Sequence, residues 1–129
     1  MAFDRVALLA VLDPPIARLA GEELRDGGFI VIETSARTLG GLAAAAHGRM
    51  IDVAVVDVAL DMTPGSIRRA FAVHSPVTVL SVACSLTTAI EVAREDDVDG
   101  ILVLKPWAPG ALLEAAWLGI NDGNGSLLD

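Results

Sequence analysis

Three side chains combine chemically useful groups with a strand-end position: an aspartate, a serine and a lysine. Asp57 closes the apolar run DVAVVD, Ser81 ends the run PVTVLS, and Lys105 follows ILVL directly. A carboxylate can attack a phosphoryl group as a nucleophile, a lysine can hold a phosphoryl oxygen, and a hydroxyl can donate a hydrogen bond to another. Each residue alone is an ordinary polar group where a strand meets solvent. The three together favour a phosphoryl-binding site.

Five apolar runs must position these side chains, and the runs recur at an even pace along the chain. Each run is short, rich in β-branched residues and nearly continuous in apolar character, which is typical of parallel strands covered on both faces. The connections between the runs are long enough to hold one crossover helix each. We therefore expect strands at 6–12, 29–33, 53–58, 77–83 and 101–104.

Helix boundaries are indicated in each connection. The first helix is expected between Pro14, whose ring suits an opening turn, and the glycines that end at Gly28. Serines precede the three middle helices as candidate N-caps, namely Ser35, Ser66 and Ser85. The last helix is expected to open at Pro109, and its apolar stripe consists of Leu112, Leu113, Ala116, Trp117 and Ile120.

Strict alternation of strands and helices predicts an α/β fold. The leading topology is a flavodoxin-like, doubly wound sheet of five parallel strands in the order 2-1-3-4-5, built as (βα)5. In such sheets, function gathers at the carboxyl ends of the strands, beside strands one and three. Asp57 ends the third strand at that place. We expect one domain over residues 1–120 and a flexible C-terminal tail over 121–129.

Composition excludes several classes of function. The chain has 129 residues and a formal net charge of −8, which argues against nucleic acid as a partner. No apolar run approaches the roughly 20 residues of a membrane-spanning helix. A single cysteine, Cys84, fits a small apolar role and a reducing, cytoplasmic location.

The motifs DVAVVD, PVTVLS and ILVLKPW, with their spacing, resemble the receiver domains of two-component response regulators. The resemblance covers the chain from Arg5 to about Ile120. It implies that Asp57 is the phosphoacceptor, Ser81 the site hydroxyl and Lys105 the phosphate-contacting lysine, with a cis peptide after the lysine. It also implies Mg²⁺ as cofactor and a histidine kinase as phosphoryl donor. The chain would then be a signalling domain and not an enzyme.

The resemblance breaks at the metal-binding acids. Receivers carry two acidic residues at the end of the first strand, where an ungapped match places Val11 and Leu12. A gap would instead bring Asp13 to the second of these positions. The remaining candidate ligands are Asp57, the backbone carbonyl of Ala59 and Asp13. Because Mg²⁺ prefers a shell of hard oxygens, we expect weak Mg²⁺ binding and impaired phosphotransfer.

A second departure concerns the switch residue. Receivers typically have an aromatic residue three positions before the lysine, where this chain has Leu102. We therefore expect an atypical receiver that acts in signalling through protein–protein contacts. The expected contact face comprises the fourth helix, the fifth strand and the fifth helix, with 87–95 and 109–120 as its helical segments. A homodimer through this face is possible.

Two alternatives remain open. The first is a fully functional phosphoacceptor that takes phosphate from a histidine kinase or a phosphotransfer protein, because Asp57, Ser81 and Lys105 are all present. The second is a small flavodoxin-like ligand-binding module. The second is weaker, since the sequence contains neither GxxxxGK[ST] nor GxGxxG.

Overall fold

Strands and helices alternate along the chain in the computed structural model. It describes residues 5–46, 48–57, 60, 64–71, 77–83, 101–105 and 107–123. In chain order the elements are β1 (Arg5–Ala10), α1 (Pro14–Asp26), β2 (Phe29–Glu33), α2 (Leu39–Ala46), β3 (Val53–Asp57), α3 (Pro64–Phe71), β4 (Thr78–Ala83), β5 (Ile101–Leu104) and α5 (Ala111–Gly123).

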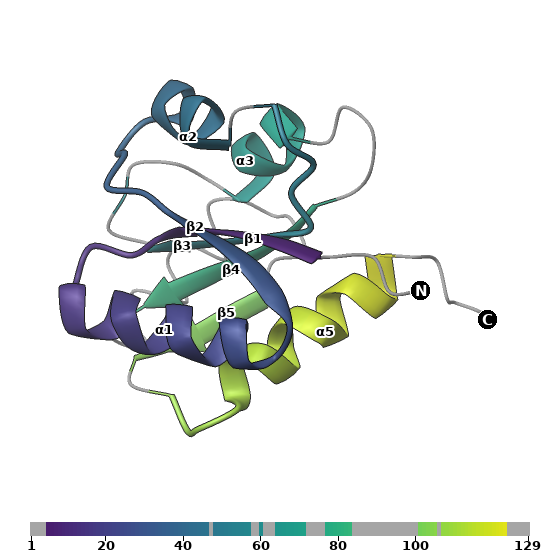
Figure 1. Ribbon diagram of the computed structural model, residues 1–129. Helices are drawn as coiled ribbons and strands as arrows, with labels where there is room; N and C mark the ends of the chain where they lie inside the picture. Colours follow the sequence, from purple (N-terminus) through teal and green to yellow (C-terminus); the bar gives the residue numbers. More distant parts are fainter. Residues whose placement is uncertain are drawn as a thin grey trace.

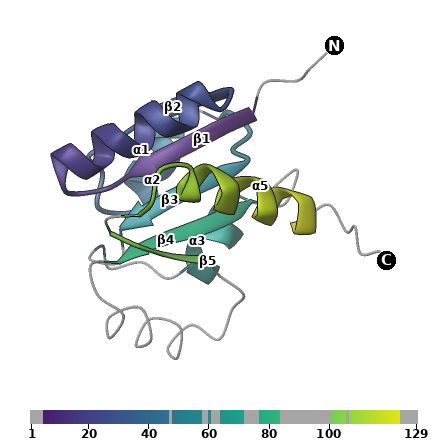
Figure 2. The same cartoon turned by 90° about the horizontal axis from the view of Figure 1, so that it is seen from below.

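The five strands form one parallel sheet in the order β2-β1-β3-β4-β5 (Figure 2). This order confirms the predicted flavodoxin-like α/β fold. The chain leaves β1 toward β2 and later returns to the other side of β1 with β3, so the switch point lies between β1 and β3. All five predicted strands are present, and β1 ends slightly earlier than expected, at Ala10.

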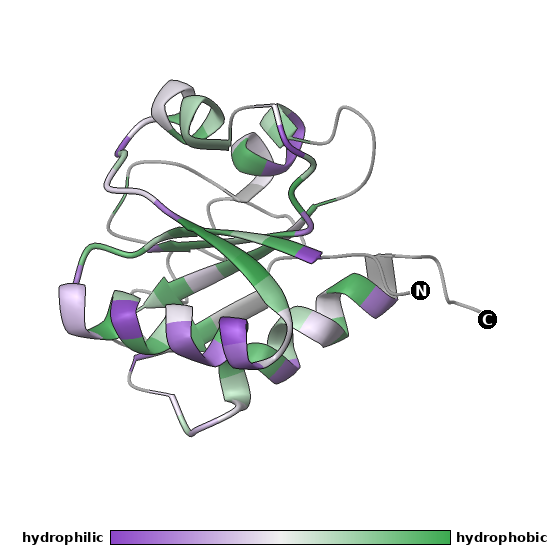
Figure 3. Cartoon of the chain, in the orientation of Figure 1, coloured by the Kyte–Doolittle hydropathy of each residue, from purple (hydrophilic) through white to green (hydrophobic). Residues whose placement is uncertain are grey.

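Helices cover both faces of the sheet. Figure 1 shows α1 and α5 together on one face and α2 and α3 on the other. Two clusters of buried apolar side chains correspond to these layers. One contains Leu24 of α1 and Leu112 of α5, and the other contains Leu42 of α2 and Ile67 of α3. β1 and β3 contribute alternate residues to the two clusters, so these central strands are mainly apolar (Figure 3).

The helix ends correct two of the predicted caps. Thr38, and not Ser35, precedes α2, and its Oγ1 accepts the backbone N–H of Gly41 at 3.0 Å. Ser66 lies inside α3, which already begins at Pro64, so it is not an N-cap. Thr38 is the N-cap because its hydroxyl lies three residues before the backbone N–H that it binds. Ser85, Cys84 and the segment 87–95 lie outside the described residues.

α1 follows its sequence signals closely, whereas α5 begins at Ala111 and not at the predicted Pro109. α1 begins at Pro14 as predicted, and its C-cap is Gly27, followed by Gly28 with φ +98°. The apolar stripe of α5 faces the core as predicted, with its buried residues being Leu112, Ala116 and Ile120. α5 continues to Gly123, past the expected domain limit at residue 120. None of the described helices is long and apolar enough to cross a membrane.

Candidate functional site

Asp57 is a charged residue in a position where the sheet is otherwise apolar. It is the last residue of β3, between β1 and β4, and only 3% of it is exposed. Its backbone stays in the ladder opposite Val82, and its carbonyl oxygen accepts the N–H of Leu60 at 3.0 Å. The strand therefore fixes the backbone, and the carboxylate is held at the carboxyl edge of the sheet. A buried carboxylate needs charged or hydrogen-bonding partners, because desolvation alone is costly.

Lys105 supplies the charged partner. It directly follows β5, and its backbone N–H donates to the carbonyl oxygen of Ala83 at 2.7 Å, which anchors it to β4. Its Nζ lies 3.0 Å from Oδ2 of Asp57, and the lysine side chain is only 14% exposed. The lysine therefore reaches past the end of β4 to the neighbouring strand. Charge-assisted hydrogen bonds of this kind are stronger than neutral ones.

A backbone donor completes the described surroundings of this carboxylate. The N–H of Leu12, in the turn between β1 and α1, lies 3.3 Å from Oδ2 of Asp57. Leu12 is half-buried, and the preceding Val11 is buried. This donor could not be predicted from the sequence, because a backbone N–H carries no sequence signal. Leu12 thus binds the carboxylate of Asp57 through its main chain.

Ser81 lies one residue further from the carboxyl edge of the sheet than Val82, which pairs with Asp57. It is buried in β4 and pairs in register with Val56 of β3 and Leu102 of β5, whereas Asp57 pairs with Val82. Successive side chains on a strand leave opposite faces, so Ser81 shares a face with Val56. Among the described residues, no hydrogen bond joins Ser81 to Asp57 or Lys105. The structure therefore brings Asp57 and Lys105 into contact and leaves the role of Ser81 a prediction.

Solved structures match this geometry, although no protein-family model and no curated protein matches the sequence. A CheY-like response regulator receiver domain from Methanospirillum hungatei aligns over 97% of this chain and 99% of its own, with a TM-score of 0.70 and 19% identity. The receiver domain of a modulated diguanylate cyclase from Desulfovibrio desulfuricans aligns over 96% and 99%, with a TM-score of 0.73 and 16% identity. The chain has the receiver-domain fold.

A third match bears on the metal. The receiver domain of a sensor histidine kinase from Pseudomonas aeruginosa aligns over 92% of this chain and 99% of its own, with a TM-score of 0.68 and 17% identity. In that protein, a magnesium ion is coordinated in the active site cleft. The receiver fold therefore provides a precedent against which the carboxyl edge of the present sheet can be compared.

The described residues contain no group of three or more His, Cys, Asp or Glu side chains that could hold a metal ion. Asp13 is exposed at the N-cap of α1, where its carbonyl oxygen accepts the N–H of Ala17 at 2.8 Å. The Lys105 ammonium already lies 3.0 Å from Oδ2 of Asp57. Ala59 and the peptide bond to Pro106 lie outside the described residues.

Proposed function

We propose that this chain is a receiver module in two-component or phosphorelay signalling, with Asp57 in the phosphoacceptor position. The observation that carries the proposal is the contact between Lys105 and a 3% exposed Asp57, at the carboxyl edge of a receiver-type sheet. The combination of a nucleophilic carboxylate and a cation for phosphoryl oxygens matches what phosphoryl transfer requires. In this proposal the domain is a signalling element, and any chemistry is limited to its own phosphorylation and dephosphorylation.

The proposed transfer has a defined atomic course. An oxygen of Asp57 forms a bond to phosphorus, the bond between phosphorus and a donor's histidine nitrogen breaks, and the imidazole leaves with the electron pair. Lys105 then moves from the carboxylate to a phosphoryl oxygen. Ser81 is proposed to donate a hydrogen bond to another phosphoryl oxygen. Because Lys105 would be the main counter-charge to the transferring group without Mg²⁺, we propose that phosphotransfer is impaired.

Weak Mg²⁺ binding is part of the same proposal. The candidate ligands remain Asp57, the carbonyl of Ala59 and Asp13, and at least one acid of the receiver pattern is replaced by the apolar Leu12. A cation that approached Oδ2 would meet the Lys105 ammonium, 3.0 Å away, and would have to displace it. Like charges at this separation repel strongly where water is excluded. The ion pair therefore supports a carboxylate that is neutralised mainly by lysine.

Because phosphotransfer is proposed to be impaired, we also propose that the chain signals through contacts with other proteins. The proposed partners are a histidine kinase or another signalling protein in the cytoplasm, or a second copy of this chain. The proposed face includes α5, on which Leu118 is 57% exposed next to the half-buried Trp117. Large apolar side chains exposed on a helix are common at interfaces. The other helix of this face, at 87–95, lies outside the described residues.

The deciding experiment is binding of beryllofluoride, a phosphoryl mimic, followed by backbone amide NMR with and without Mg²⁺. Asp57→Asn serves as the control, because it removes the attachment point while preserving the shape of the side chain. For impaired chemistry, we expect no shifts around Asp57, Ser81 and Lys105 at millimolar Mg²⁺. Shifts that require Mg²⁺ and disappear in the control would overturn impaired transfer.

A working phosphoacceptor is the second candidate, and the same ion pair favours it. Asp57 and Lys105 are held in contact by elements far apart in the sequence, which keeps both groups ready for a phosphoryl ligand. The Mg²⁺-dependent outcome of the beryllofluoride experiment would establish this candidate. Transfer from a phosphorylated histidine peptide to the wild-type chain, and not to Asp57→Asn, would then measure its rate.

A further inference from the structure

The carboxylate of Glu23 gathers three donors at the start of α5. Its Oε1 lies 3.2 Å from the indole Nε1 of Trp107 and 3.2 Å from the backbone nitrogen of Gly110. Its Oε2 accepts the backbone N–H of Leu113 at 2.7 Å. Glu23 belongs to α1, so a side chain of the first helix binds the first turn of the last one. α1 and α5 lie side by side on this face of the sheet (Figure 2).

Glu23 fills a role that α5 cannot fill locally. The helix begins at Ala111, and the residue before it is Gly110, which has φ +87° and no side chain. An N-cap side chain normally accepts the N–H two or three residues further on, which here is that of Leu113. The carboxylate of Glu23 accepts this N–H instead. Its negative charge is also favourable at the positive end of the helix dipole.

This cap holds the segment that carries Lys105. At its beginning, the backbone N–H of Lys105 is bound to Ala83 of β4. At its end, Trp107 and Gly110 are bound to Glu23, and the Trp107 ring packs against the apolar cluster beneath α1 and α5. A strand end and a carboxylate thus restrain the connection on both sides. In the sequence, a single residue separates Lys105 from Trp107, the nearer of the Glu23 contacts.

We propose that Glu23 is a positioning residue for Lys105. By fixing Trp107 and the first turn of α5, it sets the place from which the lysine ammonium reaches Asp57. Its effect on a phosphoryl ligand rests on the function proposed above, whereas its effect on the Lys105–Asp57 contact does not. No other described side chain joins α1 to this connection by hydrogen bonds.

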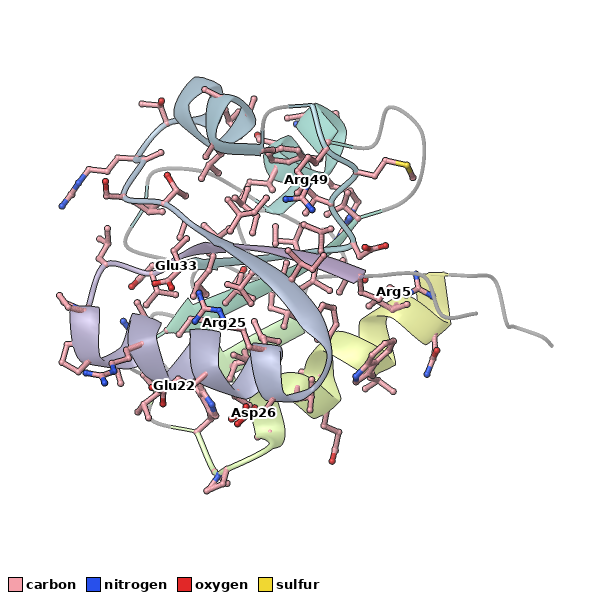
Figure 4. The ribbon with its side chains drawn as sticks, viewed as in Figure 1. Arg5, Glu22, Arg25, Asp26, Glu33 and Arg49 are labelled. Atoms are coloured by element: carbon pink, nitrogen blue, oxygen red, sulfur yellow. The ribbon has the colours of Figure 1, made fainter. Side chains whose placement is uncertain are left out.

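The test compares Glu23→Gln with Glu22→Gln by NMR in the ligand-free protein. Glutamine at 23 keeps the size of the side chain, but its amide nitrogen cannot accept, so at least one of the three contacts is lost. Glu22, which is labelled on α1 in Figure 4, is the matched control because it precedes Glu23 in the sequence. Among the described residues, it pairs only with the exposed Arg18. The readouts are the indole N–H signal of Trp107 and the ε-methylene signal of Lys105.

We expect Glu23→Gln to move both signals, with the Lys105 signal moving toward its position in Asp57→Asn. Trp107→Phe, which removes one donor and keeps an aromatic ring in place, should move the Lys105 signal less in the same direction. Glu22→Gln should leave both signals unchanged. If beryllofluoride binds the wild type, its Kd should rise about tenfold in Glu23→Gln, the size expected for one lost charge-assisted hydrogen bond.

A Lys105 signal that stays at its wild-type position in Glu23→Gln, while the Trp107 signal moves, would overturn the proposal and leave Glu23 as a helix cap only. Absence of beryllofluoride binding by the wild type is the outcome expected for impaired transfer and leaves the Lys105 readout valid. Mg²⁺-dependent binding would overturn impaired transfer and would also leave that readout valid. The two failures are therefore distinguishable in one set of samples.

Discussion

Asp57 and Glu23 both gather donors, and they differ in what they bind. Asp57, at the carboxyl edge of the sheet, is 3% exposed, and its described partners include a lysine ammonium and the backbone N–H of Leu12. Glu23, between α1 and α5, is half-buried and accepts two backbone N–H groups and an indole N–H. The main partner of Asp57 is thus a charge on a long side chain, whereas most partners of Glu23 are fixed to a helix. The first arrangement suits an exchangeable ligand, and the second suits a permanent joint.

The two regions should therefore respond differently to the loss of a partner. A buried charge without its counter-charge is costly, because neither water nor protein then neutralises it. A helix cap without its acceptor loses less, because the orphan N–H groups near the surface can bind water. The expected effects below follow this order, from the largest to the smallest.

The largest effect is expected for Lys105→Met, which leaves Asp57 buried without its cation. The free energy of unfolding, measured in urea, should fall by about 3 kcal/mol. Asp57→Asn should lower the free energy of unfolding by less than about 1 kcal/mol. The new side chain is neutral, and the ammonium of Lys105 can turn toward water. The double variant should recover most of the stability lost in Lys105→Met. Equal losses of stability in Lys105→Met and Asp57→Asn would contradict the expectation that the more deeply buried Asp57 depends more on its partner than Lys105 does.

The next effect is expected for Glu23→Ala, which removes the remote cap of α5. Its free energy of unfolding should fall by about 1.5 kcal/mol, the usual range for a lost cap with charge-assisted hydrogen bonds. Hydrogen exchange should accelerate at the Leu113 amide, which is the N–H bound at 2.7 Å. Glu22→Ala is the control and should lose about 0.5 kcal/mol or less. Unchanged protection at Leu113 would contradict the cap.

A smaller effect is expected where α1 meets α5. A Cβ at Gly27 would overlap the side chain of Leu113, while the φ of −85° at Gly27 imposes no strain. Gly27→Ala should therefore destabilise the protein by about 1 kcal/mol through overpacking, as read from thermal unfolding. Gly40→Ala is the control: it lies in α2 with nothing within 4 Å of the added Cβ, and its stability should hold or rise. A stabilised Gly27→Ala would show that Leu113 moves away freely.

The smallest effect is expected at an exposed ion pair, which gives the contrast to Lys105. Arg25 of α1 binds Glu33 of β2 at 2.7 Å, and both side chains are 48% exposed (Figure 4). Arg25→Ala should cost about 0.5 kcal/mol in low salt, and the cost should shrink in high salt because the pair is screened. A loss of stability as large as that of Lys105→Met would mean that contact distance, and not burial, determines how much these ion pairs stabilise the protein.

Much of the fold could be predicted from the order of apolar runs. The five strands and the start of α1 at Pro14 follow from local signals, since periodicity and proline placement act over a few residues. The caps were less predictable, because Ser35 and Thr38 are equally suitable by residue type. Only the path of the chain into α2 makes Thr38 the acceptor for Gly41.

The candidate site also has features that the sequence predicts and features that only the tertiary structure shows. The sequence by itself determined that Asp57 and Lys105 stand at strand ends, because apolar runs terminate at each of them. Only the tertiary structure decided that Nζ of Lys105 lies 3.0 Å from the carboxylate and that a backbone N–H in the first turn joins them. It alone also joined Glu23 to the start of α5, a contact between residues 90 positions apart. Strand and helix signals are local, whereas these contacts depend on how the parallel strands and their covering helices pack against one another.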